Sequence, residues 1–236
     1  MTARTDVSGV PIPETLERVH EQARGRFVRA GSFLDGATRR AMVLEARAAR
    51  ECGLCARRAE ALFAASVEGE HETVTELAPG LVELAHRVVT DSGRLSRAWF
   101  EGVIAAGVTP EQYVEAAGLI GSSTIADTFA VALTGEPAVL GASEGGEPSG
   151  VSNEALVDVG AYVGLMDYEH PLPRWEGRPA PNICRALAMV PSAVDEFWDL
   201  FVPHYQPMAE ADGHEVRRSQ IEFVASRTSA LNECFY

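Results

Sequence analysis

Residues 35–65 read DGATRRAMVLEARAARECGLCARRAEALFAA, and this stretch decides the predicted fold. Its apolar residues recur every three or four positions, which is the period of an amphipathic helix. We therefore predict one continuous helix over these residues, with Cys52 and Cys55 buried on its inner face. The residues on that face are Leu44, Ala48, Cys52, Cys55, Ala59 and Leu62.

The same helical period recurs along most of the chain, whereas runs with the alternating pattern of strands are sparse. A helix is expected over 109–133. Thr109 is its cap, Pro110 lies in its first turn, and Gln112 follows the cap by three residues, which together are a typical helix start. Gly135 ends it. The sequence therefore predicts an all-α protein of many helices. The other helices expected are 13–30, 81–89, 94–106, 182–189, 192–204 and 215–231.

Composition divides the chain into four parts. Residues 1–34 are expected to form an N-terminal arm and helix, and residues 35–136 a first helical half. Residues 137–180 are rich in glycine and proline and predict a linker, with one short helix near 153–166. Residues 181–236 form a second helical half.

The charge balance excludes several classes of function. The chain has 34 acidic residues and 20 basic residues, all of them arginine, for a net charge of −14. A nucleic-acid surface or an anionic membrane would need clustered positive charge, so neither is an expected partner. Because there is no lysine, Schiff-base chemistry and a P-loop are excluded.

The chain also lacks the signals of export or membrane insertion. No segment is expected to reach the roughly 18 apolar residues of a membrane span, and residues 1–13 are too polar for a signal peptide. Four cysteines are too few for a disulfide scaffold. We therefore expect a cytoplasmic protein.

Two segments resemble each other. Residues 39–62 and 217–236 each begin with an arginine pair, continue as an amphipathic helix and arrive at Glu-Cys. The similarity is explained either by two degenerate tandem copies of one unit or by chance between alanine-rich helices.

The second segment resembles a known family. Glu222, residues 229–232 (SALN), Cys234 and Tyr236 are similar to the alkylhydroperoxidase D-like and carboxymuconolactone decarboxylase superfamily. Its thiol-active members have the pattern Glu, eleven residues, Cys-x-x-Cys, three residues, His. Three other stretches, residues 105–111, 125–133 and 181–187, are also similar to that family.

The resemblance implies a helical alkylhydroperoxidase-like domain and a thiol-dependent peroxidase or disulfide reductase. Glu222 would move protons and Cys234 would be the resolving thiol, with Tyr236 beside it. The chain ends at Tyr236, before the pattern's second cysteine and histidine, so the motif is incomplete here.

The expected substrate is a peroxide or a small disulfide, reduced at the expense of a partner dithiol, with no metal or organic cofactor. The family also implies a homo-oligomer. The alternative is a non-catalytic, oligomeric helical protein of the same fold.

Cys52 and Cys55 have the C-x-x-C spacing of redox pairs, but Arg40 and Ala59 stand where the family pattern has glutamate and histidine. The pair is therefore interpreted as a degenerate copy. Three interpretations stay open: redox chemistry, inert packing, or a zinc site, which would need two further ligands.

The two cysteine sites are expected to differ in reactivity. Asn232 is a favoured helix cap, which would place Cys234 in a first turn near Glu222, where the helix dipole stabilises a thiolate. Cys52 and Cys55 would lie within an unbroken helix and react more slowly. His86 is expected to be solvated or to lie at the edge of the core, and residues 68–72 are expected to form a solvated acidic turn.

Overall fold

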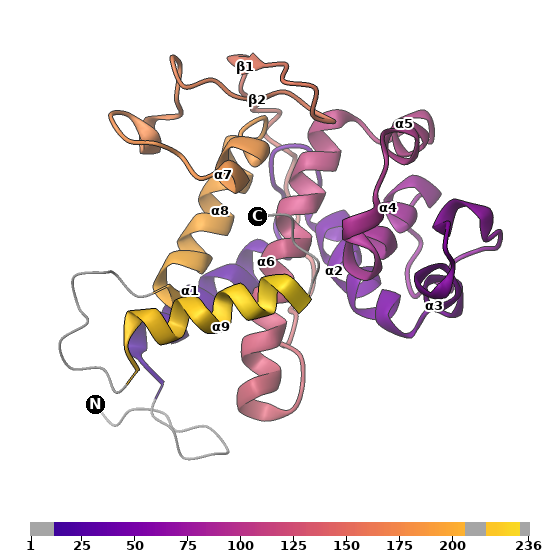
Figure 1. The fold of residues 1–236 in the computed structure, drawn as a ribbon, viewed down its shortest axis with the longest axis horizontal. Helices are drawn as coiled ribbons and strands as arrows, with labels where there is room; N and C mark the ends of the chain where they lie inside the picture. Colours follow the sequence, from indigo (N-terminus) through magenta and orange to yellow (C-terminus); the bar gives the residue numbers. More distant parts are fainter. Residues whose placement is uncertain (1–11, 206–215, 232–236) are drawn as a thin grey trace.

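The structure is a computed structural model that describes residues 12–205 and 216–231 (Figure 1). Over these residues its regular secondary structure is helical except for one antiparallel pair of two-residue strands, which confirms the predicted all-α class. The elements are α1 (Glu14–Arg26), α2 (Gly36–Ala48), η1 (Ala49–Glu51), α3 (Gly53–Glu60), η2 (Ala64–Ser66), α4 (Pro79–Thr90), η3 (Ser92–Arg94), α5 (Arg97–Ala105), α6 (Pro110–Thr134), β1 (Leu156–Val157), β2 (Leu165–Met166), η4 (Pro173–Trp175), α7 (Asn182–Leu187), α8 (Pro191–Phe201), η5 (Val202–His204) and α9 (Arg218–Leu231).

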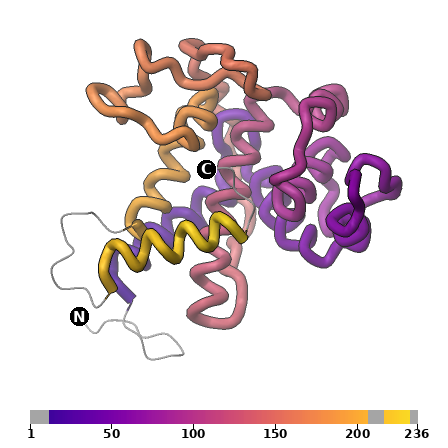
Figure 2. Tube along the Cα trace, viewed as in Figure 1, coloured from indigo at the N-terminus to yellow at the C-terminus, as the bar shows by residue number. Residues whose placement is uncertain are grey.

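Helix α6 runs through the middle of the fold, with α2–α5 on one side and α7 and α8 on the other (Figures 1 and 2). Its start is the predicted capping box of Thr109 and Gln112, and Gly135 ends it in the left-handed conformation at φ 78°. Leu119 packs in a core shared with α1, α2 and α4, whereas Val114 packs in a second core with α7 and α8. One helix therefore joins both cores.

Within the described residues, α6 is also the one helix long and apolar enough to cross a membrane by length and composition. Of its most apolar stretch, 39% is buried inside the protein. A core helix passes the same test.

A buried ionic network fixes three helices. Arg39 of α2 donates to Glu115 of α6 and to Glu196 of α8, each at 2.5 Å. The second oxygen of Glu115 accepts the backbone amides of Ser32 and Phe33. Arg39 also donates from Nε to the backbone carbonyl of Arg26 at 3.1 Å. Because Arg39 and Glu115 are each 1% exposed, these partners replace water around both charges.

The segment between α6 and α7 differs from the short helix predicted near residues 153–166. The chain there forms β1 and β2, in which Leu156 pairs with Met166 and Val157 with Leu165. Valines and glycines in this stretch favour extended and turn conformations over a helix. Met166 is buried against α7 and α8, so this part of the segment packs on the second core.

The predicted continuous helix over 35–65 is wrong, because it breaks at Cys52. Helix α2 ends at Ala48, η1 tightens the next turn, and Cys52 is extended, with φ −71° and ψ 121°. Helix α3 then begins at Gly53. Glycine favours the helix interior less than almost any other residue, and a Cβ atom here would lie 3.0 Å from a carboxylate oxygen of Glu72. Gly53 thus lets the loop after η2 approach the break.

Candidate functional site

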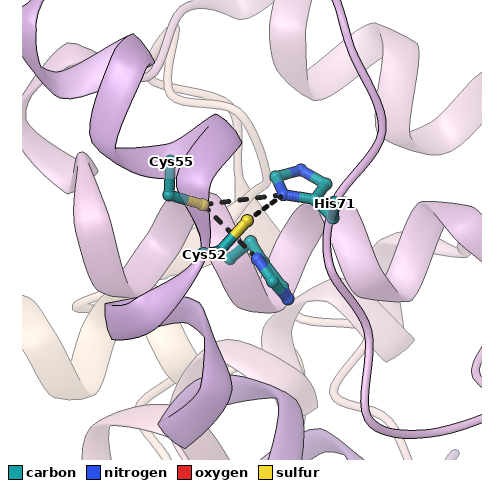
Figure 3. A group of neighbouring side chains, drawn as sticks. Cys52, Cys55 and His71 are labelled. Carbon is teal, nitrogen blue, oxygen red and sulfur yellow. Dashed lines mark hydrogen bonds between the residues drawn. The ribbon is translucent and has the colours of Figure 1, made fainter.

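The break turns both cysteines to one side of the chain (Figure 3). Cys52 caps the N-terminus of α3, and Cys55 lies in its first turn. The two residues are 1% and 3% exposed, so their predicted burial is confirmed. The prediction that they lie within an unbroken helix is not.

His71 reaches the pair from the loop between η2 and α4. Its Nδ1 atom lies 3.6 Å from the sulfur of Cys52 and 3.5 Å from that of Cys55 (Figure 3). Its side chain is 8% exposed, whereas Glu68, Glu70 and Glu72 are exposed, as the predicted solvated turn requires. The loop therefore places one imidazole ring in contact with both sulfurs.

His86 reaches the pair from α4. Its Nδ1 atom lies 3.4 Å from the sulfur of Cys55, and the residue is fully buried. The rings of His71 and His86 have their centres 4.2 Å apart. A position at the edge of the core was predicted for His86, and the structure instead places it beside a thiol.

A carboxylate holds the outer nitrogen of each ring. Nε2 of His71 lies 2.8 Å from Glu83, and Nε2 of His86 lies 3.1 Å from Glu45. A neutral ring that donates from Nε2 to a carboxylate has an unprotonated Nδ1. Such a ring turns its Nδ1 lone pair toward a sulfur that keeps its proton, and it carries a proton on Nδ1 when that sulfur is a thiolate.

Glu45 is the more enclosed of the two carboxylates. It is fully buried on α2, and its Oε1 accepts the backbone amides of Val74 and Thr75 and the Thr75 hydroxyl at 2.6–3.0 Å. Burial alone would raise the pKa of Glu45, but these donors and His86 hold it below its usual value. Glu45 therefore anchors both His86 and the chain that follows His71.

The carboxylate of Glu83 is partly buried and has three hydrogen-bonding partners, His71, Arg58 and Trp99. Arg58 of α3 donates to it at 3.0 Å, and the indole of Trp99 donates at 2.9 Å. Burial opposes ionisation, but His71, Arg58 and Trp99 outweigh it and lower the pKa of Glu83 to about 2. In turn, burial would lower the pKa of His71, yet Glu83 and the Cys52 sulfur raise it.

The two thiols differ in acidity. Burial disfavours the Cys52 thiolate, but the backbone amides of Cys55 and Glu72 and the ring of His71 stabilise it and lower its pKa to about 6. Burial raises the pKa of Cys55 to about 11, and the neighbouring Cys52 sulfur adds to that rise. One acidic thiol therefore lies beside one that stays protonated.

A pocket of about 710 Å³ reaches the site at His71. Its wall includes Arg58, Glu83 and Trp99, the groups that surround the outer nitrogen of the ring. His71 thus lies between the pocket and the two sulfurs, because its Nδ1 edge contacts both of them.

The residues predicted for the second copy lie elsewhere. Glu222 is on α9, where it accepts from the Tyr205 hydroxyl at 2.7 Å and from Arg218. No described residue of α9 is buried. Cys234 and Tyr236 lie outside the described residues, so the predicted approach of Cys234 to Glu222 stays a prediction.

Four residues of the site were missed as its members: Glu45, His71, Glu83 and His86. A signal for two of them was present, since Glu83 and His86 have the E-x-x-H spacing on one helix face. In the structure they do not share a partner, because Glu83 binds His71 and His86 binds Glu45.

The chain was compared with protein-family models, with curated proteins and with solved structures, and nothing matched in any of the three.

Proposed function

We propose that the Cys52–Cys55 pair is the redox centre of a thiol-dependent peroxidase or disulfide reductase. The observation that carries the proposal is the placement of both sulfurs on one ring, His71, which is itself held by Glu83 at the wall of a pocket. A thiol at a helix start, next to an imidazole and within reach of a second thiol, is the arrangement that dithiol chemistry requires.

Cys52 is the attacking thiol in this proposal. It is the N-cap residue of α3, where the helix dipole favours a thiolate, and its sulfur lies 3.6 Å from Nδ1 of His71. Cys55 contacts the fully buried His86 as well, which suits a resolving thiol.

The Cys52 thiol first passes its proton to Nδ1 of His71. The resulting thiolate attacks one oxygen of a hydroperoxide, an S–O bond forms, the O–O bond breaks, and the alkoxide takes that proton from His71 and leaves as an alcohol. Cys55 then attacks the sulfur of the sulfenic acid, so that a disulfide forms and water leaves with the Cys55 proton. An external dithiol reduces the disulfide by exchange and returns both protons.

The resemblance of the C-terminal segment to alkylhydroperoxidases supports the same class of reaction. The proposed setting is a reducing cytoplasm, in which Cys52, Cys55 and Cys184 persist as the free thiols that the structure has. We also propose a homo-oligomer. Leu62 and Phe63, which are 85% and 70% exposed after α3, are an apolar surface that suits contact with a second copy.

The test is hydroperoxide consumption with a small dithiol as reductant. We expect turnover in the wild-type protein and in Cys184→Ser, whose thiol is buried in α7 away from the pair. Cys52→Ser should abolish turnover, and Cys55→Ser should stop the reaction at a sulfenic acid that dimedone traps.

Two results would contradict the proposal. The first is a wild-type rate equal to that of buffer with dithiol alone. The second is turnover that survives in Cys52→Ser but is lost in Cys234→Ser, which would place the chemistry in the second segment.

A further inference from the structure

The cluster of Cys52, Cys55, His71 and His86 has a second chemical capacity, which does not depend on the proposed redox function. Each residue offers one ligand atom, and the four atoms all lie within 4.8 Å of one another. They come from the break before α3, the loop after η2, and α4. The zinc interpretation required two ligands beyond the C-x-x-C pair, and the fold supplies two.

We propose that the reduced protein binds one Zn²⁺ ion through the sulfurs of Cys52 and Cys55 and the Nδ1 atoms of His71 and His86.

The distances suit a tetrahedral zinc centre. With Zn–S bonds of about 2.3 Å and Zn–N bonds of about 2.0–2.1 Å, sulfur and nitrogen ligands are about 3.5 Å apart. Three of the four sulfur–nitrogen distances in the cluster are 3.4, 3.5 and 3.6 Å, and all four ligand atoms lie within 4.8 Å of one another. These three distances already match those of a tetrahedral site.

The groups behind the ligands also suit a metal. Zinc-bound histidines donate their other N–H to a carboxylate or carbonyl, which fixes the tautomer and the direction of the ring. Glu83 and Glu45 hold the two Nε2 atoms in that way. Arg58 donates to Glu83 and so holds that carboxylate in place behind His71.

The donor set selects zinc and a closed site. Two thiolates neutralise the charge of a divalent ion, and a set of two sulfurs and two imidazole nitrogens is typical of structural zinc. Because the protein supplies all four ligands, no position is open for substrate. A Cys52–Cys55 disulfide would remove two ligands, so the zinc-bound and oxidised forms exclude each other.

The test uses Co²⁺ as a spectroscopic probe on the full chain, reduced and freed of metal by a chelator. We expect one Co²⁺ per chain, with thiolate-to-cobalt charge transfer in the near ultraviolet and visible bands of tetrahedral intensity. One equivalent of Zn²⁺ should then bleach the spectrum.

Variants assign the ligands. The double change Cys52→Ser and Cys55→Ser should remove the charge-transfer band, and His71→Gln, at the more exposed edge, should weaken cobalt binding at least tenfold. Cys184→Ser and Asp167→Asn are the controls. Asp167 belongs to a separate, more exposed group with Glu169 and His170, and its loss should change nothing.

A further measurement needs no variant. Zn²⁺ should slow alkylation of Cys52 and Cys55 in the wild-type protein and leave the rate at Cys184 unchanged. The inference is overturned if cobalt gives no charge-transfer band, if the double variant keeps it, or if Zn²⁺ protects neither thiol. A protein that forms the Cys52–Cys55 disulfide but binds no cobalt would contradict the zinc site alone. One that binds cobalt but consumes no peroxide would contradict only the redox function.

Discussion

Two pairs of histidines lie inside this protein, and their surroundings differ. His71 and His86 each have a carboxylate on Nε2 and a sulfur near Nδ1. His20 and His204 face each other through their Nε2 atoms at 2.8 Å, and His20 stacks on Phe129 with ring centres 4.1 Å apart. Burial, His204 and Arg24 lower the pKa of His20 to about 4.

The groups around a buried histidine decide whether it can take part in chemistry. A ring with a carboxylate on one nitrogen is oriented and electron-rich, so its other nitrogen can take a proton or a cation. A ring stacked on an aromatic side chain beside a second ring and an arginine stays neutral and fills space. The comparison predicts that changes at the first pair alter chemistry, whereas changes at the second alter stability.

The largest expected effect is at His71. His71→Gln should lower peroxide turnover about 10²-fold, because it removes the group that transfers protons at the pair. His204→Gln serves as the matched control and should retain the wild-type rate. Steady-state rates at saturating dithiol measure both. Equal losses of turnover in the two variants would contradict a special chemical role for the pair of His71 and His86.

The next largest effect is expected for Glu45→Gln, which should lower the stability of the folded protein. The charged carboxylate accepts from Val74, Thr75 and His86 while fully buried. Loss of the charge should reduce the free energy of unfolding by about 2 kcal/mol. Urea denaturation measures it, and Glu144→Gln, on an exposed ion pair with Arg29, is the control. A change below about 0.5 kcal/mol would mean that the carboxylate of Glu45 does not anchor His86.

The acidity of Cys52 gives a pH dependence at the first pair. Because its pKa is lowered to about 6, the thiolate fraction is high at pH 7 and falls below that pKa. The alkylation rate of Cys52 should therefore drop about tenfold between pH 7 and pH 5. Cys184, whose pKa burial raises to about 11, should react slowly at both. Mass spectrometry of the labelled peptides follows each cysteine, and a Cys52 rate that is flat across this range would contradict the assignment.

At the second pair, pH should change the stability of the fold rather than the reactivity of a side chain. His20 has a pKa of about 4 when folded and its ordinary value of 6.5 when unfolded, so between these values the unfolded chain binds more protons. Stability is therefore present above 6.5 and is lost as pH falls toward 4. The loss attributable to His20 is about 2 kcal/mol between pH 7 and pH 5. Subtracting the profile of His20→Gln from that of the wild type isolates it, and identical profiles would refute it.

Much of the helical framework was predictable from local signals. The two ends of α6 are set by local capping that needs no tertiary contact, and the structure confirms both ends. The residues concerned are Thr109, Pro110, Gln112 and Gly135. The break at Cys52 was missed because the alanine-rich residues before it favour a helix. Gly53 was the signal for the break, and its role follows from the approach of Glu72, which only the fold supplies.

The site was half predictable. The C-x-x-C spacing singled out Cys52 and Cys55, but His71 and His86 lie 16 and 31 residues beyond Cys55, on a loop and a separate helix. No helical or strand period links positions so far apart, so their meeting depends on how α4 packs against α2 and η1.

Peptide mapping after oxidation tests most directly whether Cys52 and Cys55 act as one pair. The reduced, metal-free protein is treated with one equivalent of hydroperoxide, alkylated, digested without reductant and analysed by mass spectrometry. The prediction is an intramolecular Cys52–Cys55 disulfide, with Cys184 and Cys234 alkylated as free thiols. Recovery of Cys52 and Cys55 as free thiols, or of a disulfide that joins Cys234 instead, would contradict it.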